Sequence, residues 1–246
     1  MGKIGQSSLF LVIAVFILLA IVMTTLNPSR TSIIGEGSEA EAAIDMAARS
    51  CLQILTEREI HRLTQWGGFS ERPNVIGGEI PPIDLRTDPP NNTVTLETIQ
   101  GSLSKRVADQ FPPCIQNNMP PRFQTSIGDA QATITIQPLT VIAIINAQVS
   151  ATIGGRTTTR SEFSTKLNIP LYPLIDTYLM IVQELTSDPE STCISCINEL
   201  ARKNGQTIEK IDIDPSTTLF IITQEGIEAD GYPLEFMFGA YRGGRP

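Results

Sequence analysis

The residues of this chain best suited to chemistry are its four cysteines, Cys51, Cys114, Cys193 and Cys196. The last two form a Cys-Ile-Ser-Cys motif at the expected first turn of a helix. Thiol–disulfide enzymes place their cysteines there because the helix N-terminus stabilises a thiolate. Redox folds of the thioredoxin type reach that helix from a buried strand, whereas a helix and Asp188-Pro189 precede the motif here. A structural disulfide is therefore the favoured interpretation, with redox activity and a metal thiolate as alternatives.

The number and placement of the cysteines predict two bridges. They are even in number and lie on what we expect to be the oxidising side of a membrane. The predicted pairing is Cys51 with Cys114 and Cys193 with Cys196, although four cysteines allow three connectivities. A single zinc site shared by all four is disfavoured because only one pair has ligand spacing. The first bridge would close a loop of roughly 60 residues, worth about 4 kcal/mol in the chain-entropy model.

Other catalytic groups are scarce. His61 is the single histidine, and its charged neighbours from Glu57 to Arg62 indicate a solvated helix face. No His-Glu-x-x-His motif, Gly-x-Ser-x-Gly motif with an available histidine, or Gly-rich phosphate loop occurs, and a nucleophilic triad would lack its base. Asp212 and Asp214 would share one side of a strand, where a solvated face is favoured over a calcium site. We therefore predict a protein that is not an enzyme and holds no cofactor or metal.

Composition and charge describe a folded, acidic chain. Hydrophobic residues make up 41% and charged residues 18% of the sequence, which is ordinary for a folded protein. The net charge is −8. Nucleic-acid binding needs a basic surface, so we expect no nucleic-acid partner.

An apolar stretch near the N-terminus predicts where the protein acts. Residues 9–26 (LFLVIAVFILLAIVMTTL) contain no charge and no helix breaker. As a helix they would be about 27 Å long, close to the roughly 30 Å hydrocarbon core of a bilayer. Lys3 precedes the stretch and acidic residues follow Arg30, so we predict a single-pass helix with residues 1–8 in the cytoplasm and the rest outside. A cleaved secretory signal is the alternative, but the run is long and lacks an Ala-x-Ala-like site.

A second kind of processing is suggested just before this stretch. Gly5-Gln6-Ser7-Ser8, followed directly by the apolar run, resembles the class III signal of archaeal pilin-like proteins. In those proteins a peptidase cuts on the cytoplasmic side and leaves the helix on the mature chain. The candidate cleavage site lies between Gly5 and Gln6, and Phe10 stands where a glutamate is common.

The rest of the chain predicts an α+β fold with a mostly antiparallel sheet and the order ααβββααβββ. We divide it into a connector at 27–37, a helical region at 38–120 stapled by the first disulfide, and an α+β domain at 121–246. Asn91, in Asn-Asn-Thr, is a candidate glycosylation site in a Pro-rich loop.

The individual elements follow from hydrophobic periodicity and from turn residues. Helices are expected at about 39–65 before Gly67-Gly68, from Leu96 to Pro112-Pro113, from Pro170 onward, and from Asp188 to about Lys203. Strands are expected at 132–136, 139–153 and 156–169, with a hairpin turn at Gly154-Gly155. Three more are expected near 207–213, 217–224 and 233–241, with turns at Asp214-Pro215 and Gly226.

The whole layout resembles a family of membrane-anchored, pilin-like surface proteins of small-genome (DPANN-type) archaea. The matching features are a Lys-x-Gly-Gln-x-Ser-like start at Lys3, Cys51-Leu52, Gly67-Gly68-Phe69, Pro112-Pro113-Cys114 and an aromatic strand over 236–241. The Cys193 and Cys196 pair is not part of that pattern. The family has no established activity, so the resemblance implies a location and an architecture rather than a reaction.

Together these features favour a cell-surface structural protein, a membrane-anchored subunit of a pilus-like filament or surface assembly. Its N-terminal helix would contact membrane lipid and pack with copies of itself or with related pilin-like subunits. The protein would lie in the cell membrane with its domain outside, or in an extracellular surface filament.

Two other functions are alternatives. A monomeric, membrane-anchored binding or adhesion module would show a concave site lined by Trp66, Phe69, Tyr172 and Tyr232. An exported thiol oxidoreductase would use the Cys-x-x-Cys motif at 193–196.

Overall fold

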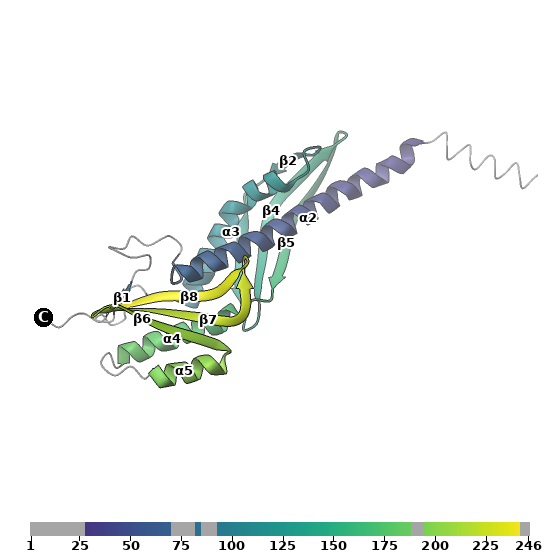
Figure 1. Ribbon diagram of the computed structural model, residues 1–246. Helices are drawn as coiled ribbons and strands as arrows, with labels where there is room; N and C mark the ends of the chain where they lie inside the picture. The colour runs from purple at the N-terminus through teal and green to yellow at the C-terminus, as the bar shows by residue number, and fades with distance from the viewer. Residues whose placement is uncertain (1–27, 70–81, 85–92, 188–193, 242–246) are drawn as a thin grey trace, which may run out of the picture.

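Helix α2 (Pro28–Gln65) is the longest helix of the described chain. The computed structural model describes residues 28–69, 82–84, 93–187 and 194–241. At about 1.5 Å per residue, α2 is roughly 57 Å long. Its N-terminal part projects beyond the strands, while its C-terminal part crosses the body of the fold (Figure 1).

The predicted start of this helix near residue 39 is wrong. Residues 28–37, expected to be a connector, are the first turns of α2. Pro28 suits the first helical position because its φ is fixed and its missing N–H would have no intrahelical partner. Gly35 and Gly37 each cost only about 1 kcal/mol relative to alanine, which a long helix tolerates.

Several predicted features lie outside the described residues. These are the apolar stretch 9–26, the candidate cleavage site Gly5-Gln6, the sequon at Asn91 and the cysteine Cys193. Within the described ranges, none of the helices is long and apolar enough to cross a membrane.

The C-terminal end of α2 is closed by the two glycines that the sequence indicates. Gly67 and Gly68 have φ of 66° and 88°, and the Gly68 N–H donates to the Leu63 carbonyl at 2.9 Å. A Cβ on Gly68 would lie 2.5 Å from Val94 Cγ2. Both the backbone conformation and the close packing therefore require glycine there.

Helix α3 (Leu96–Asn118) passes through the two prolines that we expected to end it. Pro112 and Pro113 remove two backbone hydrogen bonds, which ordinarily kinks or breaks a helix. Phe111 and Ile115, on either side of them, are fully buried, and Cys114 is bonded to α2 through a disulfide. These tertiary contacts hold the last turn in helical form.

The first sheet is antiparallel and contains β2 (Gln124–Ile127), β3 (Gln131–Ile136), β4 (Val141–Ile153) and β5 (Arg156–Leu167). β5 pairs with β4 along its length, and β2 and β3 pair with β4 as well. The three predicted strands are confirmed, and β2 is an additional one. Gly154 and Gly155 form the predicted hairpin turn with φ of 56° and 78°.

Helices α2 and α3 pack against this sheet. Side chains of α3 also bind the backbone of β3: Ser104 Oγ accepts from the Ile134 N–H at 3.0 Å, and Gln100 Oε1 accepts from the Ile136 N–H at 2.9 Å. These bonds occupy donors on β3 that face away from β4. A helix therefore covers the edge of the sheet at this point.

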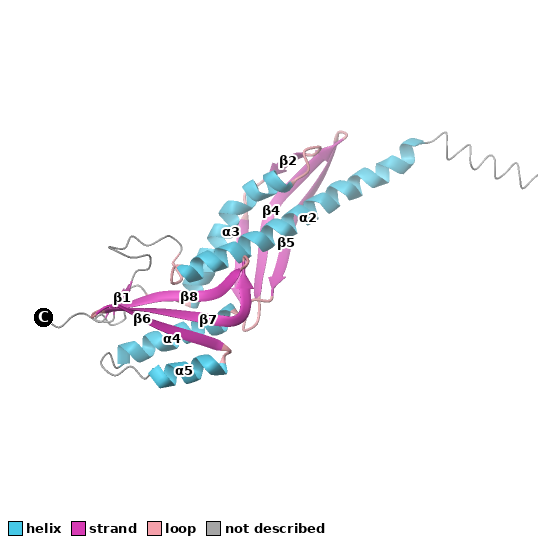
Figure 2. Ribbon diagram, viewed as in Figure 1, coloured by secondary structure: helices cyan, strands magenta, loops and turns pink. Residues whose placement is uncertain are grey.

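The second half of the chain contains α4 (Leu171–Ser187), α5 (Ile194–Lys203), β6 (Gln206–Asp214), β7 (Thr217–Ala229) and β8 (Tyr232–Tyr241). These three strands form a second sheet with β1 (Pro82–Asp84), which comes from the first half of the chain, in the order β1-β8-β7-β6. β1 is parallel to β8, and the other pairs are antiparallel. The helices α4 and α5 lie along this sheet (Figure 2). The α+β class and the mostly antiparallel pairing are therefore confirmed. The strands form two sheets rather than the single one expected, and β1 and β2 are additions to the predicted order.

Aromatic rings fill the space between α4 and this sheet. Tyr178 is fully buried, and its ring lies 4.8 Å from Phe236 and 4.9 Å from Phe238 between centroids. Its hydroxyl accepts a hydrogen bond from the Val94 N–H at 3.1 Å. Burial raises the pKa of Tyr178 to about 12, so the phenol stays neutral at physiological pH.

The predicted turn at Gly226 is wrong. β7 continues to Ala229, and the turn falls at Asp230 and Gly231, which have φ of 55° and 76°. Asp-Gly with two positive φ values is the preferred two-residue hairpin turn. Gly226, at φ 70°, lies where the β7–β8 register shifts between Thr223 and Glu228.

One contiguous group of buried apolar residues extends from Ala40 on α2 to Ala240 on β8. The predicted boundary at 120/121 falls between α3 and the sheet against which α3 packs. The helical region and the strands that follow it therefore share one core. The predicted start of the second of the late helices, at Asp188, lies outside the described residues, and its end at Lys203 is confirmed.

Candidate functional site

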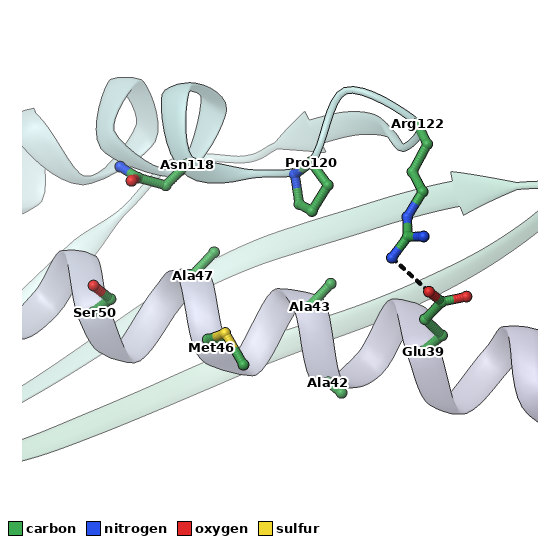
Figure 3. Close-up of a pocket in the computed structure, with 9 residues that line it drawn as sticks. All are labelled: Glu39, Ala42, Ala43, Met46, Ala47, Ser50, Asn118, Pro120 and Arg122. Atoms are coloured by element: carbon green, nitrogen blue, oxygen red, sulfur yellow. Dashed lines mark ion pairs between the residues drawn. The ribbon is translucent and has the colours of Figure 1, made fainter.

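A groove runs along the exposed side of α2, next to the loop that follows α3 (Figure 3). It has a volume of about 400 Å³, and its described lining residues are Glu39, Ala42, Ala43, Met46, Ala47, Ser50, Asn118, Pro120 and Arg122. Ala43 and Ala47 point toward the loop (Figure 3). An ion pair between Arg122 and Glu39, 2.5 Å apart, crosses the groove. These nine residues include three alanines and Met46, which give the groove a partly apolar lining.

Met46 stands at the edge of this groove as an exposed apolar side chain. It is 74% exposed, although it lies on a helix whose neighbouring positions Ala47 and Ala48 are buried. A second groove shares Met46 with the first and extends to Lys166 on β5, with a volume of about 800 Å³. We use the name α2 ridge for the surface that consists of Met46 and the two grooves beside it. Helices pack by fitting a row of side chains on one helix into the groove beside a row on another.

The α2 ridge has a further apolar residue two turns along the helix. Ile54 is 48% exposed and lines another groove with Pro113 and Asn117 of α3. Met46 and Ile54, the large apolar residues that are exposed on α2 from Glu39 onward, therefore both lie at grooves.

The disulfide between Cys51 and Cys114 fastens α2 to α3 behind the ridge. It is the pairing expected from the sequence and links positions 63 residues apart. Asn118 Nδ2 lies 3.6 Å from Cys51 Sγ and 3.5 Å from Cys114 Sγ. Cys51 is fully buried, so this bridge is part of the packed structure.

The Cys-x-x-Cys motif is only half described. Cys196 lies in the first turn of α5 and is disulfide-bonded, and Cys193 lies outside the described residues. Cys196 lines a small groove between α4 and α5 with Met180 and Ile197. Its neighbour Ile197 is buried, whereas Cys196 itself is exposed.

The prediction of a solvated helix face around His61 is wrong. The His61 ring stacks on Tyr232 of β8, with 4.6 Å between centroids and 14° between planes. Burial lowers the pKa of His61, while the nearby carboxylates of Asp230 and Glu235 act in the opposite direction. Glu59, two residues earlier, is only 1% exposed. This part of α2 therefore packs against both α3 and the second sheet.

The four aromatics proposed for a binding site have different surroundings. Trp66 lies beside arginine side chains, Tyr232 beside His61, Phe69 against the core and Tyr172 at the exposed start of α4. The four grooves described above are lined by none of them.

The two candidate calcium ligands have other partners. Asp212 accepts from the Thr218 hydroxyl at 2.9 Å and pairs with Lys210 at 3.1 Å. Asp214 accepts from the N–H and the hydroxyl of Ser216, each at 2.7 Å, and these bonds lower its pKa. Among the described residues, no group of three or more His, Cys, Asp or Glu side chains could hold a metal ion.

Sequence reasoning missed a polar network between α2 and α3. Glu59 forms an ion pair with Arg62 and accepts from Gln110 Nε2 at 2.7 Å, and Arg58 donates to Gln110 Oε1 at 2.5 Å. The available signal was spacing, because Glu59 falls four residues after Leu55 and four before Leu63, both buried. A carboxylate on an apolar stripe is a candidate for a buried ion pair.

Comparison with known proteins identified no relative of this chain. No protein-family model, curated protein or solved structure matches this chain.

Proposed function

We propose that this protein is a structural protein of the cell surface, a membrane-anchored subunit of a pilus-like filament or surface assembly. Residues 9–26 would hold it in the bilayer with the domain outside. Copies of the chain, or related pilin-like subunits, would meet through that segment and through α2. The proposal depends chiefly on the α2 ridge, where Met46 is 74% exposed between two grooves. Helices pack when side chains that project from one helix fit into grooves beside another, and the α2 ridge offers both.

The shape of α2 supports an assembly in which helices pack side by side. Its N-terminal part projects beyond the strands (Figure 1), so it is accessible to a neighbouring chain. Copies anchored in one membrane share an orientation, and their α2 helices would therefore run parallel. Met46 of one copy would fit into a groove of the next copy, so each contact would join two different surfaces of the chain. Such a contact is called heterologous. Such contacts form rings when the rotation closes and filaments when it does not.

Shearing of native cells tests the proposal directly. Released filaments and membranes would be separated, and mass spectrometry with electron microscopy would show which fraction contains the chain. We expect an ordered polymer that contains this chain, and the same spectra would show whether it begins at Met1 or Gln6. Recovery only as a detergent-extracted monomer would contradict the proposal and leave the binding or adhesion module in its place.

A matched pair of variants tests the role of the α2 ridge. Met46→Glu places a charge on the ridge, whereas Leu139→Glu places one at the turn before β4, where the side chain is equally exposed at 73%. We expect Met46→Glu to abolish assembly and Leu139→Glu to leave it intact, with both variants keeping the native melting temperature within about 2 °C. Equal assembly of the two variants would show that this surface of α2 is not part of the interface.

A further inference from the structure

Strands β5 and β6 each lie at the edge of a sheet, and neither is paired along its outer edge within the described chain. β5 pairs with β4 alone, and β6 pairs with β7 alone. The two strands belong to different sheets of the molecule (Figure 2). An unpaired edge presents a row of backbone N–H and C=O groups to which another strand can bind.

The edge of β5 opens into the larger groove of the α2 ridge. Three consecutive residues of β5, Ser164, Thr165 and Lys166, line that groove together with residues of α2. Successive side chains of a strand point to opposite faces of the sheet, so a groove that contacts three in a row reaches the edge of the strand. The groove is therefore bounded by a helix on one side and by a strand edge on the other.

This groove carries positive charge that is not neutralised by its own lining. Arg49 and Lys166 line the groove and are exposed, and neither forms an ion pair with a described residue. Its described lining residues include no aspartate or glutamate. The groove therefore favours a partner that carries carboxylates.

The edge strand of the second sheet has the opposite charge. β6 contains three acidic residues and one basic residue, whereas β5 contains three basic residues and one acidic residue. Glu209 is exposed and forms no ion pair with a described residue. Ile211 and Ile213 are 38% and 63% exposed, and Met46 and Ile142 supply apolar surface in the groove. β6 of a second copy therefore matches the groove in charge and in apolar surface.

We propose that β6 of one copy adds as a further strand to the edge of β5 in another copy, along the groove between β5 and α2. Backbone hydrogen bonds supply affinity and side chains supply specificity in this mode of binding. The β6–β7 register shifts between Asp212 and Asp214, so the regular stretch available for pairing is 206–212. Glu209 lies at the centre of that stretch and would meet Lys166 and Arg49.

This inference rests on the proposed function, in which copies of the chain assemble, and it names a second contact between them. β5 and β6 are different surfaces of the chain, so the contact is heterologous and can continue from copy to copy. It fills the groove beside Lys166 and leaves the groove beside Pro120 and Arg122 for Met46 of a neighbouring chain.

A synthetic peptide of residues 206–214 tests the groove without any filament. The full chain in detergent micelles would be added to the fluorescently labelled peptide, and anisotropy would report binding. We expect saturable binding that weakens as sodium chloride is raised, because salt screens charges near the surface. The absence of saturable binding would overturn the inference, even if shearing releases filaments. Binding of the peptide without filaments would support the inference and contradict only the proposed function.

Charge reversal locates the bound peptide on the chain. Lys166→Glu reverses a charge in the groove, and Lys105→Glu reverses one at an exposed position of α3. We expect Lys166→Glu to weaken peptide binding at least about fivefold and Lys105→Glu less than about twofold. A peptide with Glu209→Lys should bind the Lys166→Glu chain more tightly than it binds the native chain. Equal binding of the native peptide by Lys166→Glu and the native chain, with both folded by circular dichroism, would overturn the inference.

Backbone methylation of the peptide tests whether it binds as a strand. An added strand uses the N–H groups of one of its two edges, and alternate residues supply those groups. Two peptides would carry N-methyl groups, one at Ile208 and Lys210 and the other at Glu209 and Ile211. We expect one of these peptides to lose binding and the other to keep it. Equal binding by the two would show that the peptide does not add as a strand and would overturn the inference.

Discussion

The imidazole of His61 on α2 lies flat against the ring of Tyr232 on β8, with 4.6 Å between the ring centres. The contact joins the long helix to the hairpin of the second sheet, across 171 positions of sequence.

This contact predicts a pH dependence of stability. Burial lowers the pKa of folded His61 below its ordinary value of 6.5. The unfolded chain therefore binds the proton more readily, and the stabilisation present above pH 6.5 is lost as the pH falls from there through the folded pKa. We expect the melting temperature of the native chain to fall faster than that of His61→Gln between pH 7 and 5. Parallel curves would show that His61 titrates with its unfolded pKa.

Loss of the disulfide between Cys51 and Cys114 should be costly. The bridge closes a separation of 63 residues, for which the chain-entropy model gives about 4 kcal/mol. We expect Cys51→Ala/Cys114→Ala to lose about that much unfolding free energy in urea titration. Hydrogen exchange of residues 114–118 should also become faster, because the bridge supports α3 beyond its prolines. A loss below about 1 kcal/mol would mean that packing alone holds α2 and α3 together.

Two glutamates of α2 should differ sharply in their effect on stability. Glu59 is 1% exposed and bound by Arg62 and Gln110, whereas Glu57 is half-buried and accepts from Gln53 at 3.0 Å. Glu59→Ala leaves an uncompensated guanidinium, and we expect it to cost about 3 kcal/mol, since Arg62 remains partly hydrated. Glu57→Ala should cost less than about 1 kcal/mol. Comparable losses in urea titration would contradict the buried ion pair.

Alanine substitution of two glycines with similar φ values separates the cost of backbone strain from the cost of a steric clash. Gly68 has φ 88°, and an added Cβ would lie 2.5 Å from Val94 Cγ2, whereas Gly155 has φ 78° and nothing within 4 Å. Gly155→Ala should cost about 1 kcal/mol from the backbone alone. Gly68→Ala should cost about 1 to 3 kcal/mol more, because Val94 must also move. The two unfolding free energies give the comparison, and equal losses would indicate that Val94 yields freely.

Local patterns in the sequence were enough for much of the secondary structure. The apolar stripe from Leu174 to Leu185 predicted α4, and the pair Gly154-Gly155 predicted the hairpin between β4 and β5, because both signals act over a few residues. Prediction failed where distant residues decide the outcome. α3 continues past Pro112-Pro113 because Phe111 and Ile115 are buried against the rest of the fold.

The turn between β7 and β8 shows the same limit on a smaller scale. Gly226 was the turn predicted there, and Asp230-Gly231, a few residues later, forms it. Pairing with β8 extends β7 to Ala229, so Asp230-Gly231 falls at the end of the strands. The register across two strands therefore decided where the turn lies.

The sequence by itself determined the α+β class, the order of most elements and the shortage of catalytic groups, since these depend on composition and on short-range periodicity. Tertiary structure alone decided which polar residues are buried. His61 and Glu59 look like members of one charged helix face, and only their partners, Tyr232 and Gln110, distinguish them. Those partners lie 171 and 51 positions away, and a contact over such separations depends on the packing of whole elements rather than on any local pattern.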